Sequence, residues 1–335
     1  MNIFITTLGF LFVFSWLALR CYPKFGLMDR PQKYGLKRKP LPYPGGLAIF
    51  FAFLVAVIIY LPINSSTFAV LLAASILVAV SFIDDRFGLP PIFRLCVQFV
   101  SSGILVWGGM GITSITNPFG GSFALNTVTV FSDKIFLYSA ILTIVWVMVM
   151  INAFNWVDGV PGMASSIAFV SFLILFLLSI RPGFHYLDQT LAISFALIGM
   201  ALSVGFLFFD FPPPRMIMGD TGSMLLGFLL AVTAIISGGK IATTVLVLGF
   251  PILDFMWVIA RRIYKKQSPF RGDLMHFHHR LLKAGFSEGK VVVFYAAAGI
   301  VFGSLALMLH TEGKFIAFIG ILALMTVFGV VLYKK

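Results

Sequence analysis

Residues 66–86 read STFAVLLAASILVAVSFIDDR, and this stretch decides the fold class. Residues 66–83 carry no charge, and a helix of that length can cross about 30 Å of hydrocarbon. Asp84, Asp85 and Arg86 follow at once. Ionisable groups at membrane depth cost about 2.5–3.5 kcal/mol each, so a carboxylate pair there typically faces water, a metal ion or a charged partner. The stretch predicts a membrane-spanning helix that ends either in functional carboxylates or in a solvated turn capped by Arg86.

The rest of the chain has the same apolar character. Of its 335 residues, 60% are hydrophobic and 11% are charged, too few charges to cover a soluble protein of this size. Eleven apolar runs predict spans at residues 3–22, 45–63, 66–83, 94–112, 135–151, 163–181, 189–208, 223–238, 241–262, 290–310 and 315–333. We therefore expect an all-α polytopic membrane protein, with residues 1–335 forming one transmembrane domain.

The distribution of charge predicts the orientation of these spans. Eleven spans place the termini on opposite sides, and 20 of the 24 Lys and Arg residues fall on the side of Lys334 and Lys335. The positive-inside rule then places the N-terminus outside and the C-terminus in the cytoplasm. The formal net charge of +12 does not indicate nucleic-acid binding, because the basic residues lie between apolar runs. Outside, Gly120-Gly121 beside β-prone residues predicts a short external β-hairpin.

A cytoplasmic loop after the fifth predicted span is rich in amides. Asn152, Asn155 and Asp158 are spaced by three, so a helical turn would align their side chains. Such groups can hydrogen-bond a nucleobase or a ribose, and Gly159 and Gly162 would allow close backbone approach. The alternative is that Asp158 caps the next helix and the glycines only form the turn.

Residues 210–223, DFPPPRMIMGDTGS, precede the eighth predicted span. Asp220 lies between glycines at the start of this span and offers the hard oxygen that Mg²⁺ prefers. Asp210 and Arg215 are nearby candidates for substrate contacts. Alternatively, Asp220 or Thr221 merely caps the helix that follows.

Residues 271–280, RGDLMHFHHR, contain three of the chain's five histidines. The two cysteines lie elsewhere in the chain, so a zinc cluster is not indicated. We predict that His276, His278 and His279, with Arg271 and Arg280, bind phosphate oxygens. The alternative is a solvated basic loop held by anionic lipid.

The basic loop after the first predicted span contains Lys39 within residues 29–46. Substrate binding and lipid headgroup binding are both open for this loop. Together, five cytoplasmic loops supply carboxylates, amides, histidines and arginines, which are the groups needed to bind a nucleotide, phosphates and a metal ion.

These motifs resemble those of the polyprenyl-phosphate N-acetylhexosamine-1-phosphate transferases, glycosyltransferase family 4. The family includes the undecaprenyl-phosphate GlcNAc-1-phosphate transferases and the phospho-MurNAc-pentapeptide translocases. The resemblance covers nearly the whole chain. Its six motifs, in the family's order, are Lys39-Pro40 to Gly45-Gly46, Asp84-Asp85-Arg86, Asn152 to Gly159, Met218 to Ser223, Pro251 to Asp254 and His276 to Arg280.

The resemblance implies transfer of a HexNAc-1-phosphate from a UDP-sugar to undecaprenyl phosphate at the cytoplasmic face of the bacterial inner membrane, with release of UMP. The product would start a cell-envelope glycan such as lipopolysaccharide or teichoic acid. The cofactor would be Mg²⁺, with Mn²⁺ as an alternative, and the family tends to form homodimers. Asp220 resembles the metal ligand, while Asp84 and Asp85 match the acidic pair that positions or deprotonates the lipid phosphate.

Substrate-binding roles are predicted for Lys39, Arg86, Asn152, Asn155, Asp158, Asp210, Arg215, Arg271, His276, His278, His279 and Arg280. Two positions depart from the family pattern. Pro161 replaces a second acid three residues after Asp158, so that contact must be absent or replaced. Asp210 stands where the family usually carries Asn, so a uridine contact there is in doubt.

The sequence leaves three functions to distinguish. The His-x-His-His-Arg pattern and Leu253-Asp254 followed by Arg261-Arg262 resemble the GlcNAc branch, whereas three consecutive histidines are usual in the phospho-MurNAc-pentapeptide branch. A transporter or lipid flippase is the alternative from another class. Transporters place ionisable groups near the bilayer midplane, whereas the candidates here cluster at one face, which favours the enzyme.

Overall fold

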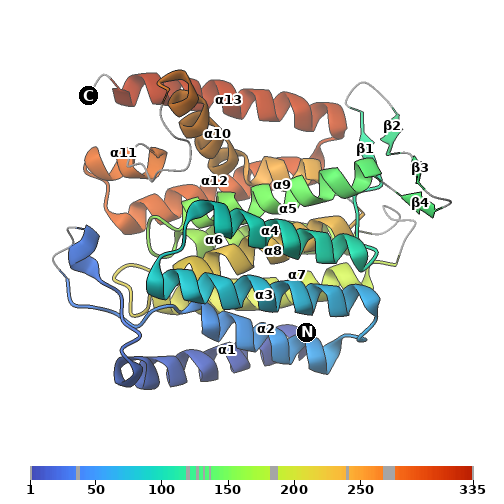
Figure 1. Ribbon diagram of the computed structural model, residues 1–335. Helices are drawn as coiled ribbons and strands as arrows, with labels where there is room; N and C mark the ends of the chain where they lie inside the picture. The colour runs from blue at the N-terminus through green and yellow to red at the C-terminus, as the bar shows by residue number, and fades with distance from the viewer. Residues whose placement is uncertain are drawn as a thin grey trace.

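The computed structural model describes residues 2–34, 38–117, 121–125, 128–130, 133–135, 137–181, 188–238, 241–266 and 276–333. Within these ranges the chain forms thirteen α-helices, two 3₁₀ helices and four short strands. Most of the long helices run side by side in one bundle (Figure 1). In the same view α1 begins toward the end that carries the strands, and α13 ends at the other. Lys334 and Lys335 lie outside the described residues.

The helices are α1 (Asn2–Cys21), α2 (Gly46–Tyr60), α3 (Ser65–Phe87), α4 (Pro91–Trp107), α5 (Leu137–Val157), α6 (Met163–Ser179), α7 (Thr190–Asp210), α8 (Gly219–Ile236), α9 (Ile241–Val247), α10 (Gly249–Tyr264), α11 (Phe277–Lys283), α12 (Glu288–Met308) and α13 (Thr311–Tyr333). The 3₁₀ helices are η1 (Tyr22–Phe25) and η2 (Pro31–Tyr34), and the strands are β1 (Ser114–Thr116), β2 (Ser122–Ala124), β3 (Val128–Val130) and β4 (Asp133–Ile135). Each predicted span overlaps a helix of this set.

The number of helices that can cross a membrane is smaller than the eleven predicted. Among the described residues, six are long and apolar enough, namely α1 (with η1), α3, α5, α7, α8 and α12, and α9 with α10 raises the number to seven if the two form one span. Helices α2, α4 and α6 are apolar but contain 17 residues or fewer. The chain is therefore an all-helical polytopic membrane protein with six or seven identified spans.

The predicted span at residues 241–262 is wrong as one continuous helix. The structure breaks it at Leu248 into α9 and α10, which are bent by 81°. Pro251 gives the physical reason, because proline has no amide hydrogen and its ring clashes with the carbonyl four residues earlier, here that of Val247. The bend turns α10 away from the direction of α9 (Figure 1).

Helix α8 forms the centre of the bundle. Every α8 residue except Asp220 and Ile236 is buried, and α8 packs against α2, α3, α5, α6 and α7. Glycines allow the closest approaches. A Cβ at Gly46 of α2 would lie 2.1 Å from the backbone nitrogen of Gly222, and one at Gly227 would lie 2.6 Å from the Met150 carbonyl of α5. Small residues at helix crossings are typical of packing within membranes, and here they fix the position of the first turn of α8.

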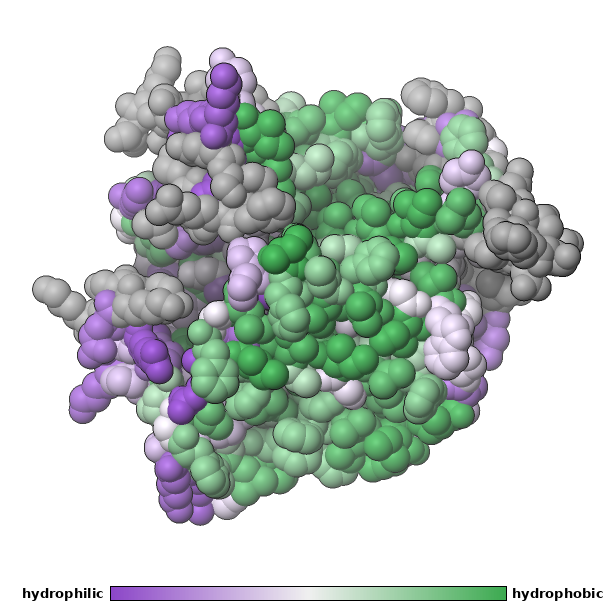
Figure 2. Space-filling model, viewed as in Figure 1, coloured by the Kyte–Doolittle hydropathy of each residue, from purple (hydrophilic) through white to green (hydrophobic). Residues whose placement is uncertain are grey.

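The face in view shows a broad apolar belt between two ends that carry hydrophilic residues, most of them at the left end (Figure 2). Large side chains such as Phe68, Phe99 and Ile141 are exposed on the bundle. Contiguous apolar surface of this extent is expected to face lipid. The belt supports the membrane assignment from a feature independent of helix length.

The predicted hairpin is present, and a second one accompanies it. Strands β1 and β2 pair antiparallel, and Asn117 N–H donates to the Gly121 carbonyl at 3.0 Å across their turn. Strands β3 and β4 form another antiparallel pair. Gly120 lies outside the described residues. Both pairs lie at the opposite end of the bundle from α11 (Figure 1).

Candidate active site

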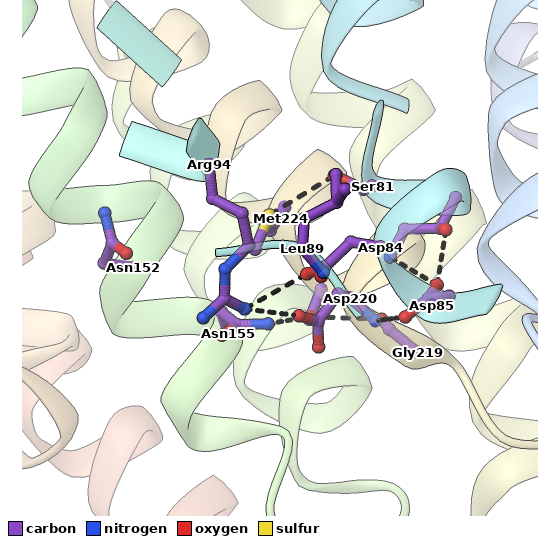
Figure 3. A network of polar contacts seen from close by, with 12 residues as sticks. Ser81, Asp84, Asp85, Leu89, Arg94, Asn152, Asn155, Gly219, Asp220 and Met224 are labelled. Atoms are coloured by element: carbon purple, nitrogen blue, oxygen red, sulfur yellow. Dashed lines mark hydrogen bonds and ion pairs between the residues drawn. The ribbon is translucent and has the colours of Figure 1, made fainter. Parts of the chain in front are cut away.

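The candidate site forms where the end of α3, the start of α4, the end of α5 and the start of α8 meet. Helix α3 ends at Phe87 because Gly88 adopts φ +75° and Pro90 and Pro91 follow. Proline is favoured in the first turn of a helix, so Pro91 begins α4 directly after this turn. The tight connection places the carboxylates of α3 beside the first turn of α4 (Figure 3).

Asp84 is buried in this turn with both carboxylate oxygens engaged. Its Oδ1 accepts from the Leu89 N–H at 2.6 Å, and its Oδ2 accepts from Arg94 Nη1 at 3.1 Å. The alternative reading, in which Arg86 caps the end of α3, is not seen. Arg86 Nη1 instead donates to the Gly26 carbonyl at 2.7 Å, away from Asp84.

Arg94, which the sequence did not single out, joins the two principal carboxylates. The same Nη1 that contacts Asp84 lies 3.0 Å from Asp220 Oδ2 (Figure 3). A signal was available, because a cation in the first turn of a helix opposes the helix dipole and therefore requires an anionic partner. The guanidinium thus occupies the point where the charges of α3 and α8 converge.

Asp85 binds the first turn of α8. Its Oδ1 accepts from the Asp220 N–H at 3.0 Å and from the Tyr43 hydroxyl, and its Oδ2 accepts from the N–H and hydroxyl of Thr221. The first N–H groups of a helix have no partner within the helix, so a carboxylate from another helix satisfies them here. The predicted alternative, in which Asp220 or Thr221 caps α8, is not the arrangement observed.

The amides at the end of α5 have separate partners. Asn155 Nδ2 donates to Ser223 Oγ at 3.3 Å, and the Asn155 side chain also hydrogen-bonds Asp220. Asn152 instead pairs with Gln98 of α4, its Nδ2 lying 2.6 Å from Gln98 Oε1. The structure therefore brings Asn155 into the carboxylate cluster and leaves Asn152 at a contact between helices (Figure 3).

Asp158 lies just past the end of α5, close enough to neighbouring carboxylates for their charges to change its pKa. Its loss of hydration, together with the carboxylates of Asp210, Asp220 and Asp85, raises the pKa of Asp158 well above its usual value. It does not cap α6, whose N-cap residue is Gly162. The side chain is thus a carboxylate that a bound cation or a hydrogen-bond donor would stabilise.

The histidine segment packs against this loop. A Cβ at Gly159 would lie 2.5 Å from His278 Nε2, so only glycine fits beside the imidazole. Burial, with His279 and His276 nearby, lowers the pKa of His278 well below its usual value. Its ring lies 5.5 Å from that of His276 and 4.2 Å from that of His279. The three histidines therefore form one cluster beside the Asp158–Gly159 loop.

Asp254 of α10 holds the start of α11. His276 Nδ1 lies 3.0 Å from Asp254 Oδ2, and the Phe277 N–H donates to Asp254 Oδ1 at 2.9 Å. The Trp156 ring packs edge-on against His276, with centroids 5.3 Å apart. These contacts join the bent α10 to the end of α5, so the carboxyl group of Asp254 is engaged in positioning.

Asp210 is buried close to Asp158, and its Oδ2 accepts from Ser165 Oγ of α6 at 2.7 Å. The remaining predicted site residues that the structure describes are not in contact with Asp84 or Asp220. Arg215 and Lys39 are exposed, and Arg280 is half-buried on α11. Arg271 lies outside the described residues.

The carboxylates of the site are candidate ligands for a divalent cation. Among the residues that the structure describes, no group of three or more His, Cys, Asp or Glu is arranged to hold a metal ion. Mg²⁺, however, is usually bound through one or two carboxylates, with substrate phosphates and water as the other ligands. Asp84 and Asp220 lie within 3.1 Å of one shared guanidinium nitrogen, so a cation already bridges them. The pair fits this mode of Mg²⁺ binding.

The chain is similar in sequence to a known protein family and to several of its members. The family model described as glycosyl transferase family 4 matches residues 67–238. The chain is 30% identical over 308 residues to a decaprenyl-phosphate N-acetylglucosaminephosphotransferase of Mycobacterium tuberculosis, covering 83% of this chain and 74% of that protein. It is 28% identical over 318 residues to a probable undecaprenyl-phosphate N-acetylglucosaminyl 1-phosphate transferase of Bacillus subtilis, covering 92% and 84%. An undecaprenyl-phosphate alpha-N-acetylglucosaminyl 1-phosphate transferase of Escherichia coli is 27% identical over 322 residues, covering 92% and 82%.

Proposed function

Because the chain belongs to glycosyl transferase family 4, we propose that it transfers GlcNAc-1-phosphate from UDP-GlcNAc to a polyprenyl phosphate. An oxygen of the acceptor phosphate attacks the phosphorus bonded to the sugar, the bridging bond to UMP breaks, and UMP leaves. The enzyme is thus a phosphotransferase. The relatives named as GlcNAc-1-phosphate transferases support this donor over the phospho-MurNAc-pentapeptide alternative.

The observation that carries the proposal is the contact of Arg94 with both Asp84 and Asp220. The reaction brings two anionic phosphates together, and their repulsion is the main barrier. A site for this reaction needs positive charge that stabilises the phosphates, and it needs carboxylates that can bind a further cation. The Arg94 cluster has both, and its side chains come from the ends of three helices, which keeps their positions fixed.

We propose that Asp220 and Asp84 hold Mg²⁺, or Mn²⁺ in its place. When bound, the ion supplies charge neutralisation on the donor diphosphate and makes UMP a better leaving group. Arg94 lies beside the same carboxylates and can contact phosphate oxygens. Asn155 and Asp158 are proposed to contact the nucleoside, and the histidines at 276–279, with Arg280, to contact the diphosphate and sugar. Arg271 completes the predicted basic set.

Asp85 is proposed to act through α8 rather than on the substrate. Its two oxygens accept four hydrogen bonds from Tyr43, Asp220 and Thr221. A carboxylate so fully engaged is a weak candidate for a base, and an acceptor phosphate that is already anionic has little need of one. The role that these contacts support is holding Asp220 in place.

We propose that the chain crosses a bacterial inner membrane eleven times. Its N-terminus would lie outside, and its active site would lie at the cytoplasmic face. The acceptor is proposed to be undecaprenyl phosphate, the product to start a cell-envelope glycan, and the protein to form a homodimer. The transporter alternative is disfavoured because the clustered carboxylates lie at helix ends, in the last turn of α3 and the first turn of α8. Transporter sites typically lie near the bilayer midplane.

The test is release of UMP from UDP-GlcNAc by purified protein with undecaprenyl phosphate and Mg²⁺, with and without a chelator. We expect UMP release that requires the lipid and is abolished by the chelator. Release from another UDP-HexNAc alone would keep the mechanism and change the donor. No release with any UDP-HexNAc would contradict the assignment.

A further inference from the structure

A basic cleft lies beside the candidate active site, between the loop that follows α1 and the end of α3. Its volume is about 620 Å³. The lining residues are Gly26, Met28, Asp29, Arg30, Gln32, Lys39, Pro40 and Arg86. Three of them are cations and one is an acid, so the cleft is suited to an anionic ligand.

The walls of the cleft are fixed by hydrogen bonds within the loop. The Asp29 N–H donates to the Leu41 carbonyl at 2.9 Å, and the Tyr43 N–H donates to the Leu27 carbonyl at 3.1 Å. Arg86 donates to the Gly26 carbonyl at 2.7 Å, which joins the loop to α3. The loop therefore presents its cations from a defined backbone, which reduces the entropic cost of binding a ligand.

The positive charges of the cleft are not neutralised by carboxylates of the cleft itself. Arg38 forms a two-pronged ion pair with Asp29, which neutralises the one acid of the lining. Among the described residues, Arg30 and Lys39 have no carboxylate partner and both are exposed. The cleft therefore has a net positive charge that an external anion would satisfy.

Neighbouring aromatic side chains indicate where that anion comes from. Phe25 is 72% exposed and Phe87 is 78% exposed, and each directly adjoins a residue that lines the cleft, Gly26 and Arg86. Phe25 ends the α1–η1 candidate span and Phe87 ends the α3 span. Exposed apolar rings at the ends of spans, beside cations, place a surface that can contact acyl chains next to positive charge that attracts anionic headgroups. A ligand with a phosphate and an apolar tail matches both features.

We propose that this cleft binds the phosphate of an anionic membrane phospholipid, such as phosphatidylglycerol, at the surface of the bilayer. The site is separate from the transfer reaction. Arg86 points to the loop, whereas the preceding Asp84 and Asp85 face α4 and α8. A lipid bound here anchors the loop that also supplies Tyr43 to Asp85.

Native mass spectrometry of the full-length protein in detergent tests the proposal, with phosphatidylglycerol or phosphatidylcholine added. The variant is the double substitution Arg30→Gln and Lys39→Gln. The matched control removes two exposed cations outside the lining, Lys24→Gln and Lys283→Gln. We expect phosphatidylglycerol to bind the wild type and control alike, and the variant to bind it about tenfold or more weakly, since the variant lacks two of the three cations that attract the phosphate.

Three outcomes would overturn the proposal. Equal binding of phosphatidylcholine would show that the charge is not recognised. An equal loss in the control would show that only the general charge of the surface matters. If the cleft variant loses undecaprenyl phosphate and keeps phosphatidylglycerol, the cleft belongs to the acceptor. Size-exclusion chromatography of each variant, compared with the wild type, establishes that lost binding does not reflect lost folding.

Discussion

Asp85 at the end of α3 accepts two hydrogen bonds from Thr221, one from its backbone N–H at 3.0 Å and one from its hydroxyl at 2.5 Å. A similar contact occurs at α11, where Asp254 of α10 accepts from the first N–H of the helix. In both cases a carboxylate of one helix satisfies the start of another, where the helix dipole favours negative charge. At the end of α7, Asp210 accepts instead from the side-chain hydroxyl of Ser165 in the first turn of α6. Acids in this chain thus have two roles, which are to bind charge at the site and to hold the start of another helix. Only their contacts in the structure distinguish these roles.

Asp85→Asn is expected to lower both stability and activity. The amide would turn a donor toward N–H groups that need an acceptor, which costs about 1–3 kcal/mol for each buried group left unsatisfied. The measurement is the apparent melting temperature in detergent beside the UMP-release rate. Thr221→Val is the matched control, since it removes only the hydroxyl donor and should cost about 1 kcal/mol. An inactive Asp85→Asn protein that melts like the wild type would show that Asp85 acts directly on substrate.

Asp220→Asn and Asp84→Asn are each expected to abolish turnover while leaving a folded, extractable protein. Each substitution removes a negative charge from the proposed magnesium pair and leaves the size of the side chain unchanged. The measurement is UMP release across a range of Mg²⁺ concentrations, with melting temperature as the control for folding. Wild-type rates from both variants would refute the site.

Arg94→Gln is expected to reduce turnover at saturating Mg²⁺ by about 10²-fold or more, as removal of a preorganised charge contact commonly does. It should also lower the Mg²⁺ concentration that gives half of the residual activity, because the guanidinium no longer competes for Asp84 and Asp220. The two effects have opposite signs, so the titration separates them. A rise in the half-saturating concentration would mean that Arg94 assists metal binding instead.

Gly159→Ala is expected to displace His278 and lower activity. The added Cβ would lie 2.5 Å from His278 Nε2, and overpacking of this kind costs about 1–3 kcal/mol. Gly103→Ala in α4 is the control, since a Cβ there meets nothing within 4 Å. Melting temperature and UMP release should both fall for the first variant and change little for the second. Unchanged activity in Gly159→Ala would separate the histidine cluster from the reaction.

The sequence predicted the positions of the helices well because each apolar run is long and contains few charges. It did not predict the break at Leu248, although Pro251 was a visible signal, because the surrounding residues remain apolar. It also did not predict helix α11, whose seven residues are too few for a periodic pattern. Local signals therefore recovered the long helices and the hairpin of β1 and β2, while the break at Leu248 and helix α11 depended on packing.

The residue types of the site were predictable, but their partners were not. Arg94 and Asp220 are 126 residues apart, and Asp85 and Thr221 are 136 apart, so no local pattern links them. Asp84 and Asp85 are adjacent and chemically identical, yet one contacts Arg94 and the other holds α8. Only the packing of α3 against the starts of α4 and α8 tells these two carboxylates apart.

The buried histidine cluster makes stability depend on pH. Burial lowers the pKa of His278 well below its usual value of 6.5, so the unfolded chain binds more protons than the folded one below that pH. The contribution of neutral His278 to the free energy of unfolding is therefore fully present above about pH 6.5. It is lost as the pH falls toward the pKa that His278 has in the folded protein. Melting temperature from pH 8 to pH 5 should fall more steeply for the wild type than for His278→Gln, which has no proton to gain. Parallel curves would show that His278 is hydrated enough to titrate normally.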